Sequence, residues 1–138
     1  MRFRTPFVFA IALAMPFTVA AQDYSFGQAE YMNSCAQCHG PGGKGDGVIA
    51  GMLNTSLPDL TQLQKNNAGV FPVAALYGLI DGTDTSGAHG STDMPAWGMR
   101  YSFDAPEMLG WDYSEADRNT FVRTRILALI EYLSTMQE

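Results

Sequence analysis

The fold is decided by one stretch of sequence, Cys35-Ala36-Gln37-Cys38-His39, which contains the only two cysteines of the chain. Residues i and i+3 of a helical turn share a face, so both thiols are expected to point into one space. This spacing suits thioether bonds from Cys35 and Cys38 to the two vinyl groups of one haem, with a ring nitrogen of His39 on the iron. C-x-x-C-H is the sequence pattern of c-type haem attachment. The stretch therefore predicts one covalently attached haem c.

Three other interpretations of the motif exist. A thioredoxin-like dithiol requires a βαβ pattern nearby, and the sequence shows none. A structural zinc site requires four ligands in separated pairs, and only His89 remains as a further histidine ligand. A chance occurrence of the motif is the third alternative. Haem attachment is the interpretation that the residues favour.

A haem iron held by His39 needs a sixth ligand or keeps an open position. Met94 lies in a glycine-rich stretch and is followed by Pro95. Because proline holds the preceding residue extended, it helps to present a sulfur atom to the iron. We therefore predict Met94 as the second axial ligand, with His89 as the alternative.

The chain resembles the class I c-type cytochromes. The resemblance rests on Cys35-Ala36-Gln37-Cys38-His39-Gly40, on Met94-Pro95, and on Leu129-Ile130-Glu131-Tyr132-Leu133. It covers about residues 27–136. It implies an all-α class I cytochrome c fold, with three to five helices around one covalently bound haem. It also implies that Met94-Pro95-Ala96-Trp97 is the axial-ligand loop.

The periodicity predicts three helices. The first spans residues 25–34, and the resemblance implies that Gly27 and Tyr31 on it meet the last helix. The second spans residues 71–81, with a buried stripe at Val73, Leu76, Tyr77 and Ile80 and a stop at Gly82. The third begins after the N-cap Ser114 and carries an apolar stripe at Val122, Ile126, Leu129, Ile130 and Leu133.

The segments between these helices are less regular. The glycine-rich residues 40–47 predict a tight turn beneath the haem rather than a phosphate-binding loop, because Lys44 is followed by Gly45 and not by Ser or Thr. A backbone carbonyl within residues 48–61 is expected to accept the Nδ1–H of His39. Residues 101–113 show no clear periodicity; core packing is the expected role, with a cover over the haem edge or an apolar docking patch as alternatives.

Trp97 and Arg100 follow Met94 closely. An indole N–H and a guanidinium group are suitable hydrogen-bond donors for haem propionates. A core tryptophan beside a surface arginine is an equally good interpretation of the same two residues.

Residues 1–21 predict a cleaved export signal, and residues 22–138 a single cytochrome c domain. Arg2 and Arg4 precede an apolar run that is too short to span a membrane, and small residues follow it at positions 19–21. Without the two arginines the chain carries 6 basic residues against 14 acidic ones, a net charge of −8. This charge argues against nucleic acid and anionic membrane surfaces as partners.

The sequence therefore predicts an exported, periplasmic monohaem cytochrome that carries single electrons between redox partner proteins and is not itself an enzyme. One alternative is the haem subunit of a larger complex, such as a periplasmic dehydrogenase. Another is a ligand-binding or peroxidase-like haem protein, if Met94 does not bind iron. With Lys44 and Lys65 as the only lysines, a lysine ring around the haem edge cannot form. We therefore expect apolar contacts near that edge and a basic partner.

Overall fold

The computed structural model describes residues 25–83 and 95–138. The predicted export signal at residues 1–21 and both candidate sixth ligands, His89 and Met94, lie outside the described residues.

The described part of the chain is helical and contains no strand, which confirms the all-α prediction. Four helices have nine residues or more, within the predicted range of three to five, and two further α-helical segments, α2 and α3, have four residues each. In chain order the elements are α1 (Phe26–Ser34), α2 (Ala36–His39), η1 (Ala50–Met52), η2 (Leu60–Gln62), α3 (Leu63–Asn66), α4 (Val73–Asp81), α5 (Trp97–Leu109) and α6 (Glu115–Thr135), where η marks a 3₁₀ helix.

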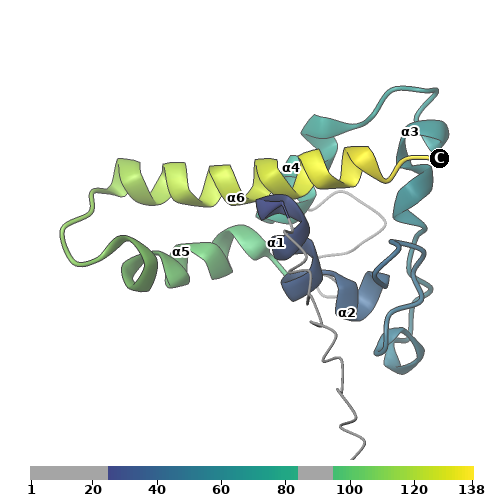
Figure 1. Ribbon diagram of the computed structural model, residues 1–138, viewed down its shortest axis with the longest axis horizontal. Helices are drawn as coiled ribbons and strands as arrows, with labels where there is room; N and C mark the ends of the chain where they lie inside the picture. Colours follow the sequence, from purple (N-terminus) through teal and green to yellow (C-terminus); the bar gives the residue numbers. More distant parts are fainter. Residues whose placement is uncertain (1–24, 84–94) are drawn as a thin grey trace, which may run out of the picture.

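Helix α6 is the long element against which the other helices pack (Figure 1). Its 21 residues make a rod of about 32 Å. Ser114 and Asp117 form a capping box at its start, each side chain bonding to the backbone N–H of the other residue. All five residues of the predicted apolar stripe, from Val122 to Leu133, are buried.

Helix α1 crosses α6 where the sequence predicts contact. A Cβ atom at Gly27 would overlap the backbone carbonyl of Ala128, so only glycine allows this approach. One turn later the ring of Tyr31 packs against Tyr132, with 5.3 Å between ring centroids. The predicted meeting of Gly27 and Tyr31 with the last helix is confirmed.

Helix α4 begins at Val73, two residues later than predicted. Pro72 has a non-helical ψ of 63° and is the N-cap. Leu76 and Ile80 are buried and Tyr77 is partly buried, but Val73 is 47% exposed. The predicted stripe is therefore wrong at Val73, which lies in the first turn. Gly82 ends the helix in the left-handed conformation, as predicted.

Helix α5 covers most of residues 101–113, where the sequence showed no clear periodicity and no helix was predicted. Its 13 residues lie alongside the first half of α6 and form a helical hairpin with it (Figure 1). Tyr101 and Ala105, four residues apart, are buried. The signal was weak because the buried stripe is narrow and because Pro106, which removes a helical hydrogen bond, lies inside the helix.

A buried ion pair joins α1 to α6. Arg125 donates from Nη1 to a carboxylate oxygen of Glu30, and both side chains are at most 14% exposed. The guanidinium group also lies over three aromatic rings, with its carbon 4.6 Å from the Phe121 centroid, 5.4 Å from Tyr101 and 5.6 Å from Phe26. Opposite charge and ring faces together offset part of the cost of removing Arg125 from water.

None of the helices in residues 25–83 and 95–138 combines the length and the apolar character needed to cross a membrane.

Replacing Gly27 with alanine is expected to lower the free energy of unfolding by about 1–3 kcal/mol, because a backbone carbonyl on α6 occupies the space of the new methyl group. Urea denaturation followed by helical circular dichroism measures the change. Gly51→Ala is the matched control, since no heavy atom lies within 4 Å of its Cβ position. Equal stability of the two variants would contradict the close crossing.

Replacing Glu30 with glutamine leaves the buried Arg125 charge without its counter-charge, and we expect a loss of about 3–5 kcal/mol in unfolding free energy. The double variant Glu30→Met/Arg125→Met is expected to lose much less, because apolar groups of similar volume replace both charges. Thermal and urea unfolding of the three proteins measure the difference. If Glu30→Gln had the same free energy of unfolding as the unchanged protein, the charge of Arg125 would have to be in contact with water.

Candidate haem site

The motif forms a helical turn that continues almost directly from α1. Cys35 ends α1 and begins α2, and its carbonyl accepts hydrogen bonds from the N–H of Cys38 at 3.1 Å and of His39 at 2.9 Å. Both cysteines are free thiols, Cys35 and Cys38 are half-buried, and His39 is buried. The local sequence thus builds the helical turn that the motif predicts.

The glycine-rich loop lies against the backbone of this turn. Its N–H groups at Gly45, Gly47 and Ile49 donate to the carbonyls of His39, Cys38 and Gln37, at 2.9, 3.1 and 3.1 Å. A Cβ at Gly47 would overlap the last two carbonyls. Because these N–H groups already donate to backbone carbonyls, they are not available to a phosphate group. Residues 40–47 therefore form a tight turn, as predicted, and not a phosphate-binding loop.

Tyr31 fixes the end of the motif. Its side chain is fully buried, and its hydroxyl donates a hydrogen bond of 2.6 Å to the carbonyl of Gly40, the residue after His39. Burial raises the pKa of the Tyr31 phenol above its ordinary value, and the nearby Cys35 thiol raises it further by a smaller amount. The hydroxyl therefore stays protonated as a donor, and the α1–α6 crossing is connected to the position of His39 through one side chain.

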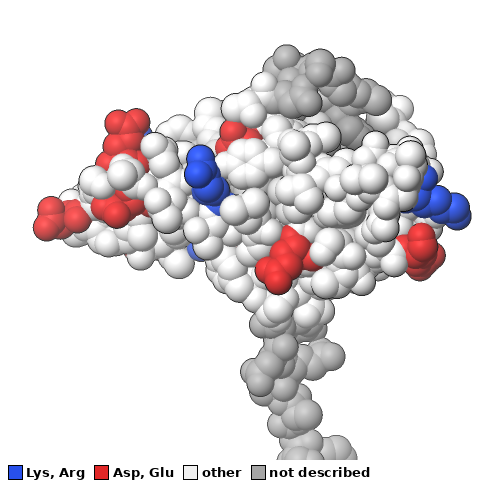
Figure 2. Space-filling view, turned by 90° about the horizontal axis from the view of Figure 1, so that it is seen from above, with Lys and Arg blue, Asp and Glu red and all other residues white. Residues whose placement is uncertain are grey.

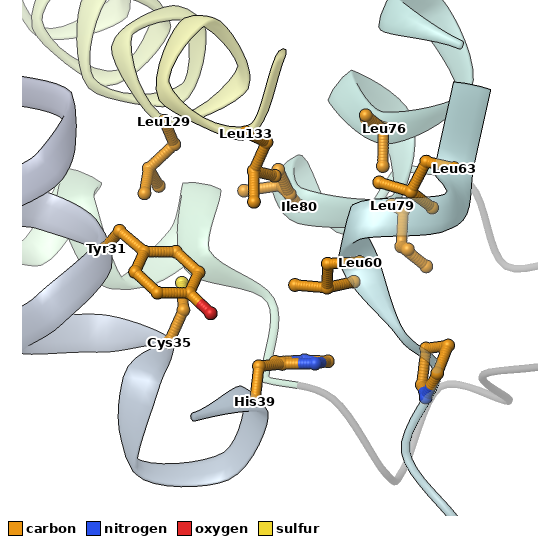
Figure 3. Close-up of a pocket in the computed structure, with 11 residues that line it drawn as sticks. Tyr31, Cys35, His39, Leu60, Leu63, Leu76, Leu79, Ile80, Leu129 and Leu133 are labelled. Atoms are coloured by element: carbon orange, nitrogen blue, oxygen red, sulfur yellow. The ribbon is translucent and has the colours of Figure 1, made fainter. Parts of the chain in front are cut away.

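A cavity lies beside the motif. Its empty volume is about 620 Å³, a figure that includes open solvent at its mouth. In Figure 3, Cys35 and His39 lie on one side, and leucines of the other helices face them across the space. The lining residues are mostly apolar: Tyr31, Cys35, His39, Pro58, Leu60, Leu63, Leu76, Leu79, Ile80, Leu129 and Leu133.

The wall around Leu60 is held by the residues that follow α6. The side-chain N–H of Gln137 donates to the carbonyl of Leu60 at 2.9 Å. The side-chain oxygen of Gln137 accepts from the backbone N–H of Gln64, also at 2.9 Å. The N–H of Glu138 donates to the carbonyl of Thr61 at 3.0 Å. This wall was not identified from sequence, because nothing local in residues 60–64 indicates a partner more than 70 positions away.

The state of the Cys35 thiol argues against a redox-active dithiol. Burial, followed by the neighbouring Cys38 and Glu30, raises the pKa of Cys35 to about 12. Cysteines that exchange disulfides have lowered pKa values, because the thiolate is the reactive form. Residues 25–83 and 95–138 also contain no strand for a βαβ unit, and no three His, Cys, Asp or Glu side chains among them could hold a metal ion.

The residues present fit a c-type haem. An apolar cavity receives a thiol from Cys35 and the imidazole of His39 (Figure 3). Cys38 is not among the described lining residues, so the expectation that both thiols point into one space is met by Cys35 alone, although Cys38 lies in the same helical turn. The carbonyl partner expected for His39 within residues 48–61 stays a prediction, although Pro58 and Leu60 of that segment line the cavity.

Trp97 and Arg100 lie on the first turn of α5. Trp97 is buried, with its ring centroid 6.1 Å from that of Tyr101, and the exposed Arg100 places its guanidinium carbon 4.8 Å from the Trp97 centroid. Neither residue is among the described lining of the cavity. Their contact with haem propionates stays a prediction.

Sequence reasoning missed the Glu30–Arg125 pair, although a signal was present. Glu30 lies three residues after Gly27, and Arg125 lies four residues before Leu129, so both charges fall on helix faces predicted to be buried. A charge on a buried face requires a partner. The sequence did not show that the two would pair with each other.

Comparison with known proteins agrees with this site. A family model described as "Cytochrome C oxidase, cbb3-type, subunit III" matches residues 22–108, which is more than half of the chain. Searches among curated proteins and among solved structures found no match. The matched stretch includes the haem motif, the cavity-lining helix α4 and nearly all of α5. The chain therefore belongs to the cytochrome c oxidase cbb3-type subunit III family of c-type cytochrome domains, and it is a c-type haem electron-transfer protein.

Proposed function

We propose that the protein is an exported, periplasmic monohaem cytochrome c that passes single electrons between partner proteins. The observation that carries this proposal is the apolar cavity into which Cys35 and His39 project together. A haem bound there supplies an iron that is reduced and oxidised by one electron. The apolar lining of the cavity would exclude water from such a haem, and His39 would supply a nitrogen ligand to its iron.

Met94 is proposed as the second axial ligand. In support, Ala96 lies against Gly82 at the end of α4, because a Cβ at Gly82 would meet the Ala96 side chain. Helix α4 contributes Leu76, Leu79 and Ile80 to the cavity. Ala96, two residues after Met94 in the sequence, therefore lies against the end of a helix that lines the cavity. If His39 and Met94 both bound the iron, no position would remain for a substrate, and the haem would serve electron transfer rather than catalysis.

A second candidate is membership of a larger oxidase assembly. The printed description of the matching family names a subunit of a cbb3-type cytochrome c oxidase, and this supports a role as one haem domain of such a complex. Stable co-purification with the other subunits at physiological ionic strength distinguishes this candidate, and the dehydrogenase alternative, from a freely diffusing carrier.

Haem attachment is tested by the two cysteines. The mature protein is expected to carry one haem that survives acid–acetone extraction and denaturing electrophoresis, and Cys35→Ser or Cys38→Ser is expected to remove one thioether bond and most of the mature product. Gln37→Ala is the matched control, because it lies inside the motif, is exposed and contributes no sulfur. Haem that extracts freely from the unchanged protein would overturn the proposal.

The sixth ligand is tested by two neighbouring substitutions. Oxidised protein is expected to show the weak sulfur-to-iron charge-transfer band at the red end of the visible range. Met94→Ala should abolish this band and lower the reduction potential, because a thioether ligand together with histidine raises it. His89→Ala should leave both unchanged. The reverse pattern would move the ligand to His89.

A further inference from the structure

The end of the α5–α6 hairpin exposes large apolar side chains. We define the hairpin tip as residues 103–117, from the second half of α5 to the first turn of α6. Phe103 is 76% exposed, Met108 59% and Trp111 100%. These three do not belong to the hydrophobic core, and α5 packs on α6 through Tyr101 and Ala105 instead. Core packing, the role expected for this segment from sequence, therefore does not account for these side chains.

The hairpin tip is also uniformly acidic. Residues 103–117 contain five carboxylates and no lysine or arginine, and all five acidic residues are exposed: Asp104, Glu107, Asp112, Glu115 and Asp117. Asp117 is used in the helix cap, and Glu115 lies 3.5 Å from Arg118. Asp104, Glu107 and Asp112 have no such role assigned within the described structure. Figure 2 shows acidic residues gathered at this end of the molecule.

An apolar centre with a charged rim is the ordinary composition of a protein docking surface. Interface centres are enriched in aromatic residues and methionine, and tryptophan is prominent among the residues that carry most of the binding energy. The hairpin tip has this composition, with an exposed tryptophan, phenylalanine and methionine among five exposed carboxylates. The rim of a single sign then determines which partner is attracted.

We propose that the hairpin tip docks a partner protein whose surface is apolar at its centre and basic at its rim. Charge complementarity selects this occupant. A second copy of the chain would place two acidic rims against each other, which is unfavourable. An anionic lipid surface would repel the same carboxylates.

The docking surface lies away from the haem site. From Trp97 to Leu109 the axis of α5 rises about 18 Å, and the hairpin extends beyond the part of the fold that contains the cavity (Figure 1). The inference goes beyond the proposed function, because binding at the tip does not depend on the identity of the sixth ligand.

The test is a titration of ¹⁵N-labelled reduced holoprotein with a reduced, lysine-rich mitochondrial cytochrome c, which serves as a basic protein surface with an apolar centre. At about 0.01 M ionic strength, where screening is weak, saturable chemical-shift changes are expected at residues 103–117. Raising the ionic strength to about 0.15 M should weaken binding several-fold. Trp111→Ala should weaken it about fivefold or more.

Matched variants separate this surface from the general negative charge of the protein. Glu107→Gln/Asp112→Asn and Glu131→Gln/Glu138→Gln each remove two exposed carboxylates, and only the first pair lies at the hairpin tip. Met52→Ala removes a side chain that is 81% exposed elsewhere and is the apolar control for Trp111→Ala. We expect weaker binding only from the tip variants, with unchanged circular dichroism for all of them.

Three outcomes would overturn the proposal. Shift changes confined to residues around the cavity opening would move docking to the haem edge. Equal losses from the two double variants would show attraction by net charge alone. Concentration-dependent self-association, or transfer of Trp111 into neutral phosphatidylcholine vesicles seen by fluorescence, without binding of the basic protein, would assign the surface to a second copy or to lipid.

Discussion

The structure depends on the close crossing of α1 and α6. Gly27 allows the backbones to touch at Ala128, and this contact brings two sets of cavity residues together. Tyr31 and Cys35 come from α1 and its end, and Leu129 and Leu133 come from α6. Because Tyr31 also holds the carbonyl of Gly40, the same crossing sets the position of the haem motif relative to the wall that faces it. Two segments about 100 residues apart in sequence thus build one site.

The Glu30–Arg125 pair stabilises this crossing in a way that apolar packing does not. A salt bridge inside a protein gains little net free energy, because both ions lose their hydration. Here the guanidinium group also lies over three aromatic rings, and these cation–π contacts offset part of the lost hydration free energy. We regard the pair as a contact that fixes the register of α1 on α6, since a shift by one residue would bury an uncompensated charge.

The apolar cavity and the exposed acidic hairpin tip lie in different parts of the molecule. The cavity is apolar and lies where α1, α4 and the second half of α6 meet. The carboxylates and exposed aromatic side chains of the hairpin tip lie at the other end, beyond the buried contacts of α5. An electron-transfer protein needs both a dry site for its redox group and a surface for brief, selective contact with partners. For a negative molecule with few lysines, the proposed basic partner would meet the second need.

The sequence by itself determined the haem motif, the all-α class and three of the four long helices. These features are local: the cysteine spacing, the Ser114 cap, the Gly82 stop and the period of the apolar stripes each act within a few residues. Only the tertiary structure decided that residues 97–109 are a helix, that Trp97 is buried against Tyr101, that Glu30 pairs with Arg125, and that Gln137 and Glu138 hold the wall at Leu60. Each of these depends on contact between segments far apart in the chain. No local pattern specifies such contacts, because their stability comes from burial that exists only after the helices have packed.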